Sequence, residues 1–89
     1  MKMSVKFSPT ALDELFYLAE NDKKTLKNLK KIIQDTQRNG TGGIGHPEQL
    51  KGNLSGVWSK QVDKKNRMQF YIEDNVVIIT KCFSHYGDK

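Results

Sequence analysis

Apolar residues recur at helical spacing in the first half of the chain and alternate with polar residues in the second half. A short apolar start at residues 5–7 is followed by Ser8-Pro9, a serine suited to cap a helix and a proline suited to its first turn. These signals predict a helix from about residue 9 to 20, interrupted at Asn21-Asp22. Its predicted apolar face consists of Leu12, Leu15, Phe16 and Ala19.

A second helix is predicted from about residue 23 to 37, with Arg38-Asn39-Gly40 as its end. Its predicted buried stripe consists of Leu26, Leu29, Ile32 and Ile33. Lysines lie largely away from this stripe and give the helix a positive face: Lys23, Lys24, Lys27, Lys30 and Lys31. That face has two interpretations, a solvated surface or a surface that contacts phosphates.

Residues 40–56 are predicted to form an irregular loop, because glycines and a proline punctuate the whole span. Three strand-like segments follow, VWSKQV, RMQFYI and VVIITKCF, and the polar breaks between them have hairpin length. They predict a three-stranded antiparallel meander. In the middle strand, alternation separates two faces: Met68, Phe70 and Ile72 on one, and Arg67, Gln69 and Tyr71 on the other.

These elements predict one α+β domain over residues 1–89, in which two N-terminal helices pack on a small antiparallel sheet in the order β-α-α-β-β-β. With 36% apolar and 28% charged residues, the composition is that of an ordinary soluble globular domain. No apolar run approaches the roughly 18 residues of a membrane span, and the N-terminus lacks the apolar centre of a signal peptide. We therefore expect a cytoplasmic protein that has no membrane partner.

The net charge of +5 gives the folded surface a positive field, which favours nucleic-acid partners. The same charge also keeps small proteins dispersed, so it does not decide the function by itself. Cys82, the single cysteine, lies in a continuous apolar run and is interpreted as a core thiol. Histidines and carboxylates show no metal-ligand spacing, and we expect neither a metal nor another cofactor.

RNA can be cut without a metal, because its own 2′-hydroxyl can attack the adjacent phosphate. The reaction needs a base for the hydroxyl proton, a cation for the crowded phosphorane and an acid for the departing 5′-oxygen. Glu48, Arg67 and His85 fit these three tasks by their chemistry, and Tyr86 can stack on a base.

Each of these residues also has an ordinary interpretation. Glu48 follows a proline in a loop, where carboxylates usually face water. Arg67 has Asp63 and Glu73 available for a surface salt bridge. His85 lies near a chain end that can fray, and the register of the preceding hairpin decides whether it shares the face of Arg67. His46 is a second candidate acid or simply a loop histidine.

Three stretches taken together resemble the YoeB (Txe) family of toxins within the RelE/ParE superfamily: GIGHPEQLKGNLSGVWSK, NRMQFYI and the closing HY. The resemblance covers nearly the whole chain, and the string G-x-P-E-x-L-K-x-x-L-S-G-x-W-S is its specific part. It implies a RelE-like fold of the microbial-ribonuclease kind. It also implies that Glu48 is the general base, Arg67 stabilises the transition-state phosphate, His85 is the general acid and Tyr86 orients the mRNA base. The implied phosphate-binding residues are Lys51 and Lys60.

The resemblance further implies the toxin of a type II toxin-antitoxin system, a metal-independent endoribonuclease that cuts translated mRNA in the ribosomal decoding site. The implied partners are the ribosome with its mRNA and a YefM-like antitoxin, which together with the toxin represses their own operon. The resemblance implies that operator DNA is bound only by that complex. A homodimer is a further possibility.

Two departures from the family pattern lie beside the expected site. Family members commonly have two arginines after Trp-Ser, where this chain has Lys60 and Gln61, so one cation is missing. Members usually end at the tyrosine, whereas residues 87–89 follow Tyr86 here. These departures favour an alternative, a catalytically weakened module that occupies the ribosome or the antitoxin without cutting. A gyrase poison of the ParE kind is a third interpretation, opposed by the matched Glu48, Arg67 and His85.

Overall fold

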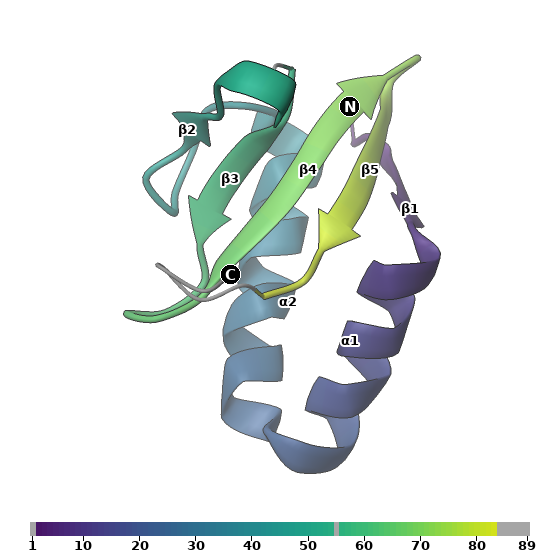
Figure 1. The fold of residues 1–89 in the computed structure, drawn as a ribbon, viewed down its shortest axis with the longest axis vertical. Helices are drawn as coiled ribbons and strands as arrows, with labels where there is room; N and C mark the ends of the chain where they lie inside the picture. The colour runs from purple at the N-terminus through teal and green to yellow at the C-terminus, as the bar shows by residue number, and fades with distance from the viewer. Residues whose placement is uncertain (1, 55, 84–89) are drawn as a thin grey trace.

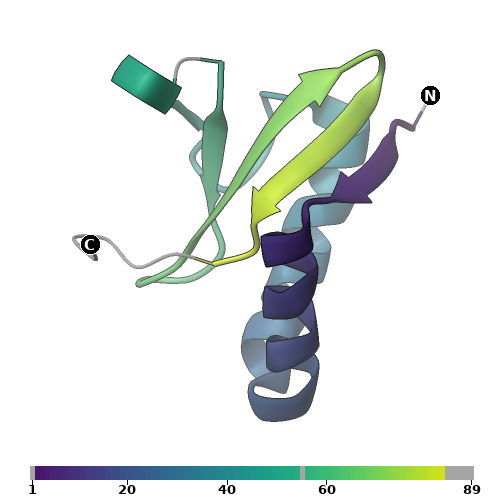
Figure 2. The ribbon, with the colours of Figure 1, turned by 45° about the vertical axis from the view of Figure 1, so that its right-hand side comes forward.

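Among the described residues, two helices cover one face of a five-stranded sheet, and no α-helix lies on the other face, which we call the open face (Figures 1 and 2). The structure is a computed structural model that describes residues 2–54 and 56–83. The order along the chain is β1 (Ser4–Phe7), α1 (Pro9–Asn21), α2 (Lys23–Asn39), β2 (Glu48–Gln49), a 3₁₀ turn (Gly52–Leu54), β3 (Trp58–Gln61), β4 (Arg67–Glu73) and β5 (Val76–Lys81). In the sheet, the strands lie in the order β1-β5-β4-β3-β2.

The two helices begin and end at the residues that cap them. The Ser8 hydroxyl accepts a hydrogen bond from the Ala11 N–H at 3.1 Å and donates one to the Thr80 carbonyl at 3.2 Å, which ties the start of α1 to β5. Asp22 ends α1, and its carboxylate accepts from the N–H of Thr25 to begin α2. Both predicted helices are confirmed, although α2 continues to Asn39.

The predicted apolar face of α1 is confirmed at Leu15, which packs against the core, and is wrong at Leu12, Phe16 and Ala19, which are exposed. The predicted face of α2 is confirmed. In α1, Ala11 and Leu18 are buried, while Phe16 is 58% exposed and Leu12 is 38% exposed. The cause is the tie between Ser8 and β5, which turns Ala11 toward the sheet, where its carbonyl accepts a hydrogen bond from the Cys82 thiol. In α2, Leu29 and Ile32 are buried, and Leu26 and Ile33 pack against the core beside them.

The predicted meander of β3, β4 and β5 is confirmed, as is the predicted first strand, β1, and β2 is an additional short strand. Asp74 and Asn75 have positive φ angles of 52° and 62°, as a tight hairpin between β4 and β5 requires. β1 pairs with β5 in parallel, so the sheet is mixed rather than wholly antiparallel. The loop over residues 40–56 is not wholly irregular, because Glu48 and Gln49 pair with Ser59 and Trp58.

Side chains on the covered face of the sheet make the core. Met68, Phe70, Val77 and Ile79 alternate with residues of the open face along β4 and β5, and all four are fully buried. Leu29 and Ile32 of α2 pack against them. The predicted alternation of β4 is therefore confirmed, and Arg67, Gln69 and Tyr71 lie on the opposite face.

Phe70→Ala should destabilise the protein by about 3–5 kcal/mol, because it leaves a cavity under both helices. Phe16→Ala is the matched control: the same atoms are removed from a ring that is 58% exposed, and the change should stay within about 0.5 kcal/mol. Urea unfolding followed by circular dichroism measures both values. Similar losses in the two variants would contradict the assignment of the core.

Candidate active site on the open face of the sheet

Strand pairing brings the glycine-rich loop and two strands together on the open face. Glu48 of β2 lies opposite Ser59 of β3, and Gln61 of β3 lies opposite Arg67 of β4. Residues that lie directly opposite one another in antiparallel strands project from the same face. Glu48, Ser59, Gln61 and Arg67 therefore form one cluster, although the sequence separates the first from the last by a loop and a hairpin.

Arg67 is held in place at the centre of this cluster. Its Nε donates to the Ser59 hydroxyl at 2.8 Å, and Nη2 donates to the Ser59 carbonyl at 3.0 Å and to the His46 carbonyl at 2.7 Å. The side chain is only 9% exposed. A guanidinium held by several hydrogen bonds on a strand is a preorganised cation, which is what a phosphate with developing charge requires.

Glu48 reaches solvent beside that cation. Its Oε1 lies 3.9 Å from Nη2 of Arg67, and its side chain is 62% exposed. At that distance and exposure the ion pair contributes little to stability. The carboxylate is therefore accessible to a substrate on the open face, and Lys51, exposed just after β2, comes from the same loop.

The loop that carries Glu48 is fixed by backbone contacts on both sides. The Gly45 carbonyl accepts from the Gln61 N–H at 2.6 Å, and the next carbonyl, that of His46, binds Arg67. His46 itself has a φ angle of 49°, in the left-handed region that costs energy for a residue other than glycine. His46 therefore contributes its backbone carbonyl to the cluster, and its role as a second acid stays a prediction.

Lys60 is not a phosphate-binding residue in this structure, contrary to the prediction. It lies opposite Met68, so its side chain points to the helix-covered face, where it is fully buried. Its Nζ donates to the Thr36 hydroxyl at 2.9 Å and to Asp35 Oδ2 at 3.2 Å, and lies 5.6 Å from the centre of the Phe70 ring. Burial lowers the pKa of Lys60, and the Asp35 carboxylate offsets part of that effect.

Asp35 was not identified from the sequence. Burial acts to raise the pKa of its carboxyl, but hydrogen bonds from Asn39, Lys60 and the Ile44 N–H outweigh burial and hold that pKa below its usual value. Its ion pair with Lys60 joins residues 25 apart in the chain. Ser59 was missed as well, since only the register of β3 against β4 shows that it binds Arg67.

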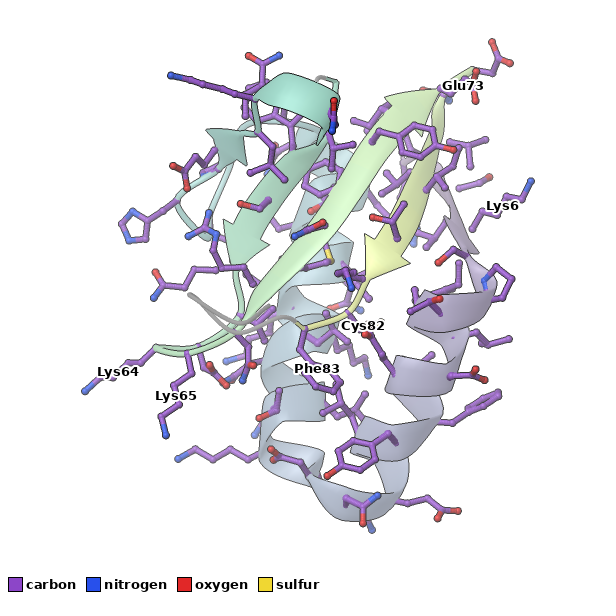
Figure 3. All side chains as sticks on the ribbon, in the orientation of Figure 1. Lys6, Lys64, Lys65, Glu73, Cys82 and Phe83 are labelled. Carbon is purple, nitrogen blue, oxygen red and sulfur yellow. The ribbon has the colours of Figure 1, made fainter. Side chains whose placement is uncertain are left out.

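His85 and Tyr86 lie outside the described residues, so their roles stay predictions. The last described residues follow β5, where Lys81 lies opposite Gln69 beyond a register shift in the pairing. Figure 3 shows Cys82 and Phe83 at this end of β5, and Lys64 and Lys65 projecting from the turn between β3 and β4.

Cys82 is a core thiol, as predicted. Its side chain is fully buried, and Sγ donates to the Ala11 carbonyl at 3.2 Å. Burial, reinforced by the nearby Glu14 carboxylate, raises the pKa of the thiol to about 12. The raised pKa favours the protonated thiol near neutral pH, and full burial keeps the sulfur away from solvent, as is typical of a structural cysteine.

Residues 7–86 match the model of a protein family described as the YoeB-like toxin of bacterial type II toxin-antitoxin systems. The chain belongs to the YoeB family. Toxin YoeB from Escherichia coli O6:H1 is 37% identical over 84 residues, which cover 94% of this chain and 100% of that protein. Family membership makes this protein a toxin of a type II toxin-antitoxin system.

Solved YoeB structures share the fold over nearly the whole chain. A YoeB dimer from Staphylococcus aureus has a TM-score of 0.87 at 36% identity, and the match covers 97% of this chain and 100% of that chain. The heterotetrameric YoeB-YefM toxin-antitoxin complex from S. aureus has a TM-score of 0.86 at 36% identity with the same coverage. Neither helix in the described part of our protein is long and apolar enough to cross a membrane.

Gly43→Ala should destabilise the protein by at least about 1 kcal/mol more than Gly52→Ala. Both glycines have positive φ angles, 84° and 70°, so both variants carry the cost of a side chain there, about 1–2 kcal/mol. Only at Gly43 would the new Cβ collide with the Asp35 carboxylate, because nothing lies within 4 Å of a Cβ at Gly52. Thermal unfolding measures the difference, and equal losses would contradict the placement of the loop against Asp35.

The free energy of unfolding should fall as the pH drops below about 3.8, the ordinary pKa of an aspartate. The pKa of Asp35 is lower in the folded state than in the unfolded state, so the unfolded state binds more protons in this range. Stability is therefore lost as the pH falls through the folded-state pKa. Asp35→Asn should reduce the pH dependence of the unfolding free energy. Urea unfolding between roughly pH 2 and pH 6, the range in which carboxylates titrate, would measure it. Asp13→Asn, at an exposed position of α1, is the matched control; equal flattening by both variants would refute the assignment.

Proposed function

We propose that this protein is a metal-independent endoribonuclease that cuts translated mRNA on the ribosome. The observation that carries the proposal is an exposed carboxylate beside a guanidinium held by hydrogen bonds: Glu48 Oε1 lies 3.9 Å from Arg67 Nη2 on the open face. A base and a fixed cation side by side are two of the three groups that 2′-hydroxyl attack needs.

In the proposed reaction, Glu48 takes the proton of the 2′-hydroxyl as its oxygen attacks the adjacent phosphorus. Arg67 stabilises the negative charge of the phosphorane. The bond from phosphorus to the 5′-oxygen then breaks, and His85 donates the proton that this oxygen receives, leaving a 2′,3′-cyclic phosphate and a free 5′-hydroxyl. Tyr86 orients the base by stacking, and Lys51 supports the phosphate.

The proposed partners follow from family membership and from charge. A YefM-like antitoxin would neutralise this toxin, since the S. aureus relative forms a complex with YefM. The complex of the two would bind operator DNA and repress the operon. A homodimer is proposed because an S. aureus relative is a dimer. The net charge of +5 suits a protein that works beside ribosomal RNA in the cytoplasm.

One observation favours a weaker second candidate, a toxin that occupies the ribosome without cutting. Neither residue after Trp58-Ser59 adds a cation next to Arg67, because Lys60 points into the core and Gln61 is uncharged. Phosphate stabilisation there would depend more heavily on Arg67 and Lys51. The two candidates differ in whether translation arrest is accompanied by new mRNA ends.

Glu48→Gln should reduce mRNA cleavage by at least about 100-fold, because the amide cannot accept the hydroxyl proton. The measurement is mapping of mRNA 5′ ends after mixing purified protein with ribosomes that carry a defined mRNA. Glu20→Gln, at an exposed position of α1, is the control and should cut like wild type. Arrest of translation by wild type and Glu48→Gln alike, with no new ends, would refute the nuclease and support the second candidate.

A further inference from the structure

A partly buried ion pair lies on the opposite face of β3 from the cluster of Glu48 and Arg67: its lysine is fully buried and the side chain of its aspartate is 13% exposed. Lys60 Nζ, on the covered face of β3, donates to Asp35 Oδ2 of α2 at 3.2 Å. The same oxygen accepts the N–H of Ile44 in the glycine-rich loop at 3.0 Å, and the other oxygen accepts from the Asn39 side chain at 2.6 Å. One carboxylate oxygen therefore joins a buried cation of the sheet to the backbone of the loop.

The loop residues that follow are each held by a different partner. Ile44 is held by Asp35, the Gly45 carbonyl by the N–H of Gln61, and the His46 carbonyl by Arg67. Glu48 then pairs with Ser59, which also binds the guanidinium. An unbroken series of contacts thus runs from the ion pair to both groups of the candidate site.

We propose that Asp35 and Lys60 are positioning residues that set the orientation of Glu48 and Arg67 through this loop. The inference rests on the proposed function and adds two residues that never touch the substrate. A buried ion pair is often replaceable by apolar residues without loss of stability, so packing alone gives no reason for a charged lysine here. The specific contribution of the pair is to aim a carboxylate oxygen at the Ile44 N–H.

The close packing of the loop against Asp35 and Lys60 supports this assignment. A Cβ on Gly43 would collide with the Asp35 carboxylate, and one on Gly45 would come within 3.0 Å of Lys60 Cβ. The loop is therefore packed directly against both members of the pair. Since a misplacement of about 1 Å can cost roughly 100-fold in rate, loss of the pair should act on catalysis more than on substrate binding.

The decisive experiment compares Lys60→Met, Lys60→Arg and Asp35→Asn with the exposed controls Lys2→Met and Asp13→Asn. Cleavage on ribosomes carrying a defined mRNA should show kcat lowered roughly 10- to 100-fold in Lys60→Met and Asp35→Asn, with KM changed little. Lys60→Arg keeps a cation for Asp35 and should recover most of the rate. The two controls should match wild type.

A second measurement tests the same inference without any cleavage. Hydrogen exchange at the amides of Ile44 and Gln61 should accelerate in Lys60→Met and Asp35→Asn, because both amides donate to the contacts that hold the loop. If Lys60→Met fails to fold, Asp35→Asn, which keeps the side-chain shape, carries the test. A folded variant that lacks the pair and retains the wild-type kcat would overturn the inference.

Failure of the proposed function gives a different result. Wild-type protein that cuts no mRNA would refute the nuclease, and amide exchange then decides the positioning role by itself. Unchanged exchange at Ile44 and Gln61 in Asp35→Asn would overturn that role, and accelerated exchange would support it.

Discussion

The candidate site depends on the hydrogen bonds of one buried guanidinium. A cation removed from water must find polar partners, and Arg67 finds them in the hydroxyl and carbonyl of Ser59 and in the carbonyl of His46. Ser59 belongs to β3, the strand before β4, whereas His46 belongs to the glycine-rich loop, 21 residues before Arg67. The hydrogen bonds that Arg67 needs therefore also assemble the site, because the loop whose His46 carbonyl accepts from Arg67 leads directly to Glu48.

Two neighbouring residues of β3 point to opposite faces of the sheet and bind different partners there. Ser59 points to the open face and supports Arg67, whereas Lys60 points to the core and pairs with Asp35. The glycine-rich loop is held from both sides, by Asp35 at Ile44 and by Arg67 at His46. β3 thus connects the candidate site on the open face to the ion pair on the covered face. Under our proposal, a substitution of Lys60 in the core alters the site without contacting it.

Elements with a local signal could be predicted from the sequence, and those that depend on distant contacts could not. Ser8-Pro9 and Gly40 mark the helix ends, and alternation in β4 separates Met68 from Arg67. The inward turn of Lys60 depends on the register of β3, and its pairing with Asp35 joins residues 25 apart. The buried face of α1 likewise involves distant contacts, from Ser8 to Thr80 across 72 positions and from Cys82 to Ala11 across 71. Such contacts leave no pattern in neighbouring residues.

Asp22 gives the helical half of the molecule a property of its own, because one residue both closes α1 and opens α2. The two helices have no spacer in which an insertion can be absorbed. One added residue at this corner would separate the end of α1 from the start of α2, so Asp22 could no longer cap both helices. The length of the chain at this corner is therefore fixed by a single residue, whereas the turn that bears Lys64 and Lys65 is held by the Asp63 carboxylate, which accepts from the N–H groups of Lys65 and Asn66 (Figure 3).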